Sequence, residues 1–177
     1  MNIFAHIERL TEFQFDIVKY FSITLEKGGI KKDVNEFYDF LNRMEELPEI
    51  EEDLSNLLVW IEEIGNNIGA KKHLFRNESI TADVQAIPPP AKQMAVYEIP
   101  VDNLRLYCLV LNYHVVFLFN GGIKTTNDAK NCPNVGPHIK MANKIVKGID
   151  ELLKEKEIKW NKDIRDIEFE KNLEFEL

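Results

Sequence analysis

The sequence is poor in the features that mark secreted and membrane proteins. Its 177 residues include only two cysteines, Cys108 and Cys132, too few for a disulfide framework. No apolar run approaches the roughly 20 residues that cross a bilayer. The first residues, MNIFAHIERLTEF, include Glu8 and Glu12 and lack the pattern of a secretory signal. We therefore expect a cytoplasmic protein without a membrane segment.

Familiar motifs for cofactors and metals are also missing. The sequence has no phosphate-binding P-loop, no HExxH and no paired CxxC. Its four histidines are scattered along the chain without a recognisable ligand spacing. The sequence thus predicts neither a cofactor nor a metal site.

The charge that is present is unevenly distributed. The formal net charge is −8, yet residues 70–147 contain ten Lys/Arg and five Asp/Glu, a net charge of +5. The rest of the chain carries −13. A basic middle between acidic ends could bind a phosphate backbone locally. The alternative is a solvated surface with uneven charge.

Hydrophobic periodicity predicts a strand and two helices in the N-terminal third. Apolar residues stand at odd positions from Phe13 to Leu25, a period of two that is typical of a strand, and Gly28-Gly29 ends it. Residues 33–45 show helical spacing, with Asp33 as the expected N-cap and Glu36 completing a capping box. A second helix over 49–65 follows Pro48.

The rest of the chain predicts more strands and one further helix. KKHLFRNES and ADVQAIP are typical of short strands, and the segment PPPAKQMAVYEIP is expected to be a loop because of its prolines at 88–90. Residues 104–111 and 115–120 predict an antiparallel hairpin with its turn at 112–114. A helix is expected from Pro137. The alternating tail, 164–177, is expected to pair along a sheet edge, with Ile167 and Phe169 buried.

Together these elements predict a single α+β domain over residues 1–177. We expect a mostly antiparallel sheet, with the two N-terminal helices packed on one face and a further C-terminal helix.

The candidate functional residues are cations on strands or at strand ends. Arg105, Tyr107 and Leu109 share one face of their strand because side chains alternate. An ordinary structural role is open for each: a surface ion pair for Arg105, a partly buried ring for Tyr107, and a solvated turn residue for the lysine after Gly121-Gly122. The full set of charged candidates is Lys71, Lys72, Arg76, Arg105 and Lys124.

The segment LRLYCLVLNYHVVFLFNGGIKTTNDAKNCPNVGPHIKMANKIV resembles the C-terminal half of RelE/HigB-like toxins of bacterial toxin–antitoxin systems. The matching features are Arg105 on the first hairpin strand, the apolar run 115–119, Lys124-Thr125-Thr126 and an alanine in the following helix. LFRNES is similar to an Arg-bearing strand of that family, with Arg76 in the Arg position. The resemblance implies a core over residues 14–150, with 151–177 as an acidic extension. The sequence departs from the family's pattern in having Thr125 where a second lysine is usual.

The resemblance implies a metal-independent endoribonuclease without cofactors, commonly acting on messenger RNA at the ribosome and neutralised by a cognate antitoxin. The RNA 2′-hydroxyl would attack the adjacent phosphate, with charge stabilisation from Arg76, Arg105 and Lys124. Tyr107 would assist proton transfer, or else Lys71 or Lys72. Lys71, Lys72, Thr125 and Thr126 would contact RNA. Two alternatives stay open: a non-catalytic protein-interaction module of the same fold, and an unrelated small-molecule-binding domain.

Overall fold

The computed structural model describes residues 1–78 and 83–177, and it confirms the α+β class. The predicted segments KKHLFRNES and ADVQAIP each end or begin within 79–82, outside the described residues. The strands are β1 (Ile3–Gln14), β2 (Lys19–Lys27), β3 (Ile30–Lys31), β4 (Arg76–Asn77), β5 (Gln85–Ile87), β6 (Leu104–Asn112), β7 (Val115–Ile123), β8 (Lys159–Trp160), β9 (Ile167–Glu168) and β10 (Glu174–Glu176). The helices are α1 (Glu36–Glu45), α2 (Glu51–Glu63), α3 (Ala91–Tyr97) and α4 (Gly136–Lys154), with short helical turns η1 (Pro48–Ile50), η2 (Ile64–Ile68), η3 (Lys72–Leu74) and η4 (Ala129–Asn131).

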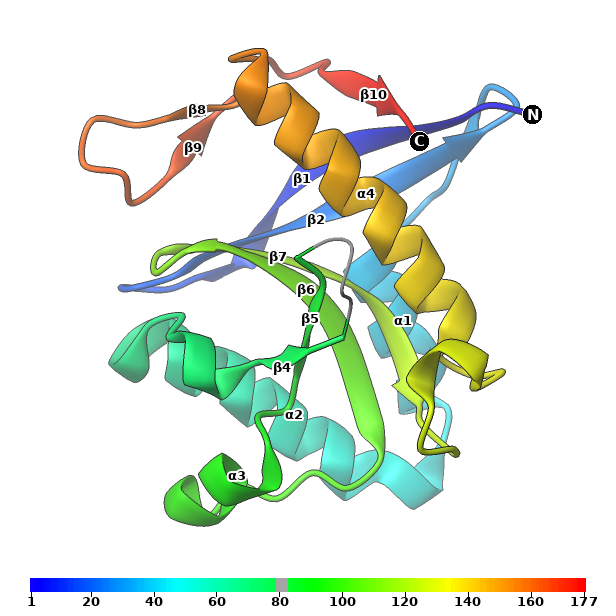
Figure 1. The fold of residues 1–177 in the computed structure, drawn as a ribbon, viewed down its shortest axis with the longest axis vertical. Helices are drawn as coiled ribbons and strands as arrows, with labels where there is room; N and C mark the ends of the chain where they lie inside the picture. Colours follow the sequence, from blue (N-terminus) through cyan, green and yellow to red (C-terminus); the bar gives the residue numbers. More distant parts are fainter. Residues whose placement is uncertain (79–82) are drawn as a thin grey trace.

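One large sheet organises the molecule (Figure 1). Its strands follow the order β10-β1-β2-β7-β6-β5-β4, and β3 pairs with β2. All neighbouring strands are antiparallel except β2 and β7, which are parallel. The predicted hairpin is confirmed, since β6 and β7 pair antiparallel. A separate two-stranded sheet joins β8 and β9.

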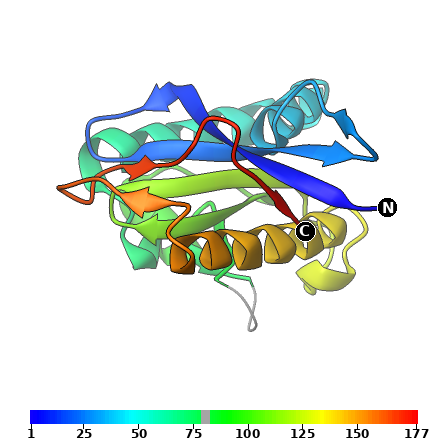
Figure 2. The same ribbon diagram turned by 90° about the horizontal axis from the view of Figure 1, so that it is seen from above.

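Hydrophobic side chains fill both faces of the sheet, because its strands alternate apolar residues between the two sides. Phe21 and Phe117 belong to the core beneath α4. Tyr20 and Leu118 belong to the core beneath α1 and α2. Figure 2 shows the sheet between α4 on one side and α1 and α2 on the other. No helix in the described part of the chain is long and apolar enough to cross a membrane.

The parallel strands β2 and β7 lie together only briefly. They share three residue pairs, from Lys19–Val115 to Phe21–Phe117, and then diverge. Helix α1 contacts both strands and lies in the opening between them (Figure 1). The backbone N–H of Phe37 donates to Ser22 Oγ of β2 at 3.2 Å. The first turns of α1 therefore bridge β2 and β7 where the two strands no longer pair with each other.

Polar side chains fasten α1 to β7 in this opening. Asn120 Nδ2 donates to Glu36 Oε2 at 3.2 Å and to Asp39 Oδ2 at 2.8 Å. Arg43 Nε donates to Asp39 Oδ2 at 3.1 Å, and Arg43 Nη2 donates to Asn120 Oδ1 and to the Gly121 carbonyl. We call Glu36, Asp39, Arg43 and Asn120 the α1–β7 network. Arg43 pairs with Asp39, and Lys32 pairs with Glu36, so each carboxylate of the network has a cation beside it.

The N-terminal third differs from the sequence prediction in two ways. The period-two pattern from Phe13 to Leu25 is not one strand: it spans the end of β1, a turn and most of β2. The expected capping box is also wrong, because Asn35 is the N-cap of α1 and its side chain accepts from the Tyr38 N–H. Glu36 is instead the first helical residue and is buried, where Asn120 and Lys32 donate to its carboxylate.

The glycines after the apolar run of β7 are part of the strand, which continues to Ile123. Gly121 lies opposite Leu106, and Gly122 lies opposite Arg105. A Cβ placed on Gly121 would lie 1.9 Å from the Arg105 carbonyl oxygen. Gly121 therefore allows β6 and β7 to approach closely at an irregularity in their register.

The expected edge pairing of the C-terminal tail holds for residues 174–176 only, because Ile167–Glu168 (β9) pairs with β8 in the separate two-stranded sheet. β10 runs antiparallel to β1, with Phe175 opposite Ala5. Ile167 is buried and Phe169 packs against the same core, while Glu168 and Glu170 are exposed or nearly so. The segment expected as an extension beyond residue 150 thus contributes to the core beneath α4.

Candidate functional site: a basic groove beside two arginines

Strand pairing brings the predicted arginines together on the face that carries α4. Arg76 of β4 lies opposite Ala86 of β5, which lies opposite Tyr107 of β6. Arg105 stands two residues before Tyr107 on the same strand and therefore on the same face. The two guanidiniums are close enough for the charge of Arg76 to act on Arg105.

The guanidinium of Arg105 is buried without a compensating acid. The residue is 7% exposed, and Nη1 donates to the carbonyl oxygens of Asp102 at 3.2 Å and Leu104 at 2.9 Å. Among the described residues, no carboxylate lies within 4.0 Å of Arg105 and its Nε has no hydrogen-bond partner. Burial and then the charge of Arg76 lower its pKa, although arginine stays protonated at neutral pH. A buried cation of this kind favours an anionic ligand.

Arg76 is held in a similar way. Its Nε donates to the Pro88 carbonyl and its Nη2 to the Pro89 carbonyl, both at 2.9 Å. Burial lowers the pKa of Arg76, and the nearby charge of Glu78 opposes that shift. In the described part of the chain Arg76 makes no ion pair within 4.0 Å. Backbone carbonyls thus orient both arginines and leave their positive charge for another group.

A groove opens next to Arg105, between β4 and the connection from β7 to α4. One part, of about 390 Å³, is lined by Arg105, Lys124, Thr125 and Thr126, among others. An adjoining part, of about 350 Å³, is lined by Glu78, Lys124 and residues 127–130. Lys124 and Asn127 line both parts, so the two are neighbours. We call them together the basic groove.

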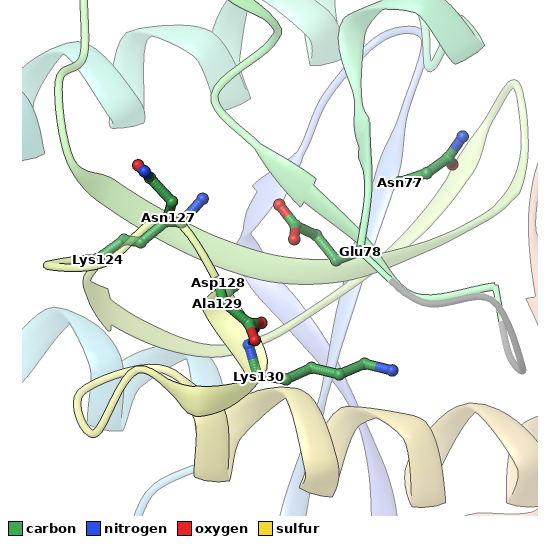
Figure 3. A pocket seen from close by; sticks show the side chains of 7 residues that line it. All are labelled: Asn77, Glu78, Lys124, Asn127, Asp128, Ala129 and Lys130. Carbon is green, nitrogen blue, oxygen red and sulfur yellow. Dashed lines mark hydrogen bonds between the residues drawn. The ribbon is translucent and has the colours of Figure 1, made fainter.

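The polar side chains of the second part face a common space. In Figure 3, Glu78 and Lys124 extend toward the region between β4 and the 124–130 segment, whereas Asn77 points away; Asn127 also lines this part of the groove. The divergence of Glu78 and Asn77 follows from the alternation of side chains along an extended chain. The groove therefore holds an amine, an amide and a carboxylate near Arg105. Such a set can bind a phosphodiester and move a proton.

Tyr107 and Cys132 lie beneath the groove. Tyr107 is fully buried and its hydroxyl has no partner among the described residues. Burial first, and the charge of Glu78 second, raise the pKa of Tyr107 well above its ordinary value, so it is a poor proton carrier at neutral pH. Although burial opposes ionisation, hydrogen bonds from Thr125 and from the backbone of Asn134 and Val135 lower the pKa of Cys132 to about 6. Cys132 Sγ lies 3.4 Å from both Thr125 N and Thr125 Oγ1, and so holds the Lys124–Thr125 segment in place.

The structure brings some of the predicted residues together and separates others. Arg105, Lys124, Thr125 and Thr126 line the basic groove. Arg76 is not one of its lining residues, although its charge acts on Arg105. Lys71 and Lys72 do not meet the groove. The Ala70 N–H donates to the Tyr113 carbonyl, so the chain just before these lysines lies by the hairpin turn, at the opposite end of β6 from Arg105, and neither lysine lines the groove. Tyr107 is in the core below the groove rather than in it.

Sequence reasoning missed Glu78, Asn127 and Cys132. The signal for Glu78 was present, because it stands two residues after Arg76 and shares its side of the strand. Asn127 and Cys132 lie in an irregular connection where no periodicity indicates which side chains turn inward. Among the described residues, the group of side chains able to hold a metal ion, His6, Glu26 and Glu174, lies on β1, β2 and β10, away from the groove.

Comparison with protein-family models, curated proteins and solved structures found no match to this chain.

Proposed function

We propose that this protein is a metal-independent endoribonuclease of the RelE/HigB-like kind and that the basic groove binds the scissile phosphate. The observation that carries the proposal is the guanidinium of Arg105, which is buried, has no carboxylate partner among the described residues and lines the groove. A planar guanidinium pairs with two phosphate oxygens at once. Arg76 and Lys124 add positive charge to the same place.

The residues at the groove suit cleavage by the substrate's own 2′-hydroxyl. That oxygen attacks the adjacent phosphorus, the bond to the 5′-oxygen breaks, and the products are a 2′,3′-cyclic phosphate and a 5′-hydroxyl. Arg105, Arg76 and Lys124 stabilise the negative charge that grows on the phosphorane. Glu78 takes the proton of the 2′-hydroxyl, and water or Lys124 returns one to the leaving oxygen.

The test is cleavage of a short labelled RNA by the purified protein in EDTA. We expect Arg105→Ala to lower the cleavage rate on the order of 10²-fold, with a smaller change in RNA affinity, because the interaction strengthens as charge develops. Arg105→Lys keeps the positive charge but loses the planar guanidinium that pairs with two phosphate oxygens, so it should recover only part of the cleavage rate. A substrate with a 2′-deoxynucleotide at the cleavage site should stay intact.

The matched control is Lys71→Ala/Lys72→Ala, which removes two cations at the far end of β6. It should cleave at nearly the wild-type rate. A wild-type protein that is inert in EDTA and in a bacterial translation extract would contradict the nuclease proposal and favour a non-catalytic interaction module. Cleavage undiminished by Arg105→Ala would place the activity outside the groove.

The proposal includes a partner protein that blocks the groove, since free cleavage of RNA would harm the cell that makes the enzyme. The expected consequence is that the wild-type gene expressed alone arrests bacterial growth, whereas Arg105→Ala does not. Co-expression of the neutralising partner should restore growth. Equal growth with the wild type and with Arg105→Ala would count against this role.

A further inference from the structure

Three side chains from three neighbouring strands meet on the sheet face opposite α4. His6 of β1 lies directly across from Glu174 of β10, and Glu26 belongs to β2 on the other side of β1. His6 Nε2 lies 2.9 Å from Glu26 Oε2 and 4.0 Å from Glu174 Oε2. One atom from each residue lies within 4.8 Å of the other two. Strand pairing, rather than a loop, fixes all three positions.

The spacing of these atoms suits a zinc ion. Zinc binds imidazole nitrogen and carboxylate oxygen at about 2.0–2.2 Å, so two ligand atoms of a tetrahedral site lie about 3.4 Å apart. The two measured separations, 2.9 and 4.0 Å, lie on either side of that value. Small rotations of the glutamate side chains would equalise them. The imidazole favours zinc over calcium or magnesium, which prefer oxygen ligands alone.

The charge around the three residues also favours a cation. Glu8 and Glu176 lie on the same face, because the former stands two residues from His6 and the latter two residues from Glu174. Glu8 accepts the hydroxyl hydrogen of Thr24. Across the described residues, none of these four glutamates has a lysine or arginine within 4.0 Å. Lys31, although it lies opposite Glu26 in the β2–β3 pair, makes no such contact.

A neutral histidine alone cannot satisfy this group. Its Nε2 can donate one hydrogen and so can serve one carboxylate at a time. A divalent ion in the same place accepts the Nε2 lone pair and an oxygen from each glutamate together. We propose that His6, Glu26 and Glu174 form a zinc site that fastens β10 to the β1–β2 hairpin, independently of the basic groove. Water completes the coordination.

The test is a calorimetric titration with zinc. The full chain is first treated with a chelator and then freed of it. We expect one zinc per chain, with His6→Gln and Glu174→Gln each weakening binding about tenfold or more. Zinc at a hundredfold excess over its dissociation constant should raise the melting temperature by about 5 °C, because it binds the folded state alone. Magnesium should leave the melting temperature unchanged.

The matched control is Glu176→Gln, which removes the same charge from the same strand and face but leaves the three ligands intact. It should keep zinc affinity within about twofold of wild type. The side chain of Glu174 is 54% exposed, so Glu174→Gln should fold normally by circular dichroism and separate lost binding from lost structure. Absence of saturable zinc binding to the wild type would overturn the proposal. An equal loss in Glu176→Gln would overturn it too, by showing diffuse attraction to an acidic surface.

Discussion

Two arginines meet the same short stretch of β7, residues 120–122, and differ in how they are partnered. Arg43 comes from α1 and donates to Asp39, to Asn120 and to the Gly121 carbonyl. Arg105, on β6, lies opposite Gly122, and within the described part of the chain it donates to two carbonyls of its own segment. The first charge is neutralised within the fold, and the second is left for a ligand. The presence or absence of an acidic partner, more than burial, thus distinguishes a structural arginine from a candidate binding residue.

The largest expected effect comes from the glycine between the two arginines. Gly121→Ala places a Cβ 1.9 Å from the Arg105 carbonyl oxygen, so β6 and β7 must separate. We expect it to lower the free energy of unfolding by about 3 kcal/mol or more. Gly122→Ala is the control, because its Cβ would lie 3.1 Å from its nearest neighbour, the Asn134 carbonyl oxygen, a much milder contact. Urea unfolding of both variants measures the difference, and equal losses would refute the close-approach explanation.

The comparison is tested directly by removing each arginine. Arg43→Ala should lower the free energy of unfolding by about 2 kcal/mol, because it strips hydrogen bonds from Asp39 and Asn120 in a partly exposed network. Arg105→Ala should change it by less than about 1 kcal/mol, since a buried, uncompensated charge is removed along with its contacts. Denaturant unfolding at neutral pH distinguishes the two. A larger loss in Arg105→Ala than in Arg43→Ala would reverse our assignment of structural and binding roles.

An effect smaller than that of Arg43→Ala is a pH dependence near the α1–β7 network. Burial first, and then the charge of Arg43, lower the pKa of His138 to about 4, while Asp39 opposes that shift and Lys32 adds to it. The unfolded chain gains this proton near the ordinary histidine pKa, about 6.5, before the folded chain does. Stability therefore falls as pH drops from about 6.5 toward 4, by about 1 kcal/mol between pH 7 and pH 5.5.

His138→Gln should remove this dependence of stability on pH. The free energy of unfolding of the wild type and of His138→Gln is measured at pH 7 and at pH 5.5. Asp39 acts in a lower range. Burial raises its pKa, but hydrogen bonds from Asn120 and Arg43 outweigh burial and lower it. The contribution of Asp39 to the free energy of unfolding is therefore fully present above the ordinary aspartate pKa. It is lost as the pH falls through the lowered pKa of the folded state. A wild-type slope that persists in His138→Gln would assign the titration to another group.

The sequence predicted those parts of the fold whose patterns are local. The β6–β7 hairpin followed from unbroken alternation, and α4 from its apolar stripe. β1 was missed because Ala5, Ile7 and Leu10 are its buried residues, and the register shift after Arg9 breaks the period of two. The odd-position pattern from Phe13 onward hid a turn, since Phe13, Phe15 and Ile17 are only partly buried there.

The sequence predicted only part of the candidate site. Alternation placed Arg105 and Tyr107 on one face, and the structure agrees. Among the described residues Arg105 has no acid partner. This depends on which side chains the fold brings near it, and no local sequence pattern indicates that. The group of His6, Glu26 and Glu174 was invisible for a related reason: its members are far apart in sequence and meet only through strand pairing.

The position of β1 between β2 and β10 also affects how the chain can fold during synthesis. β1 is the first of these strands to leave the ribosome, and β10, its outer neighbour, is the last. At usual translation rates the interval is roughly 10 to 30 s. Throughout it, the outer edge of β1 offers unpaired N–H and carbonyl groups to any other nascent chain. Chaperone demand and misassembly should therefore concentrate on this edge, and should end when Phe175 packs over Gly148 of α4.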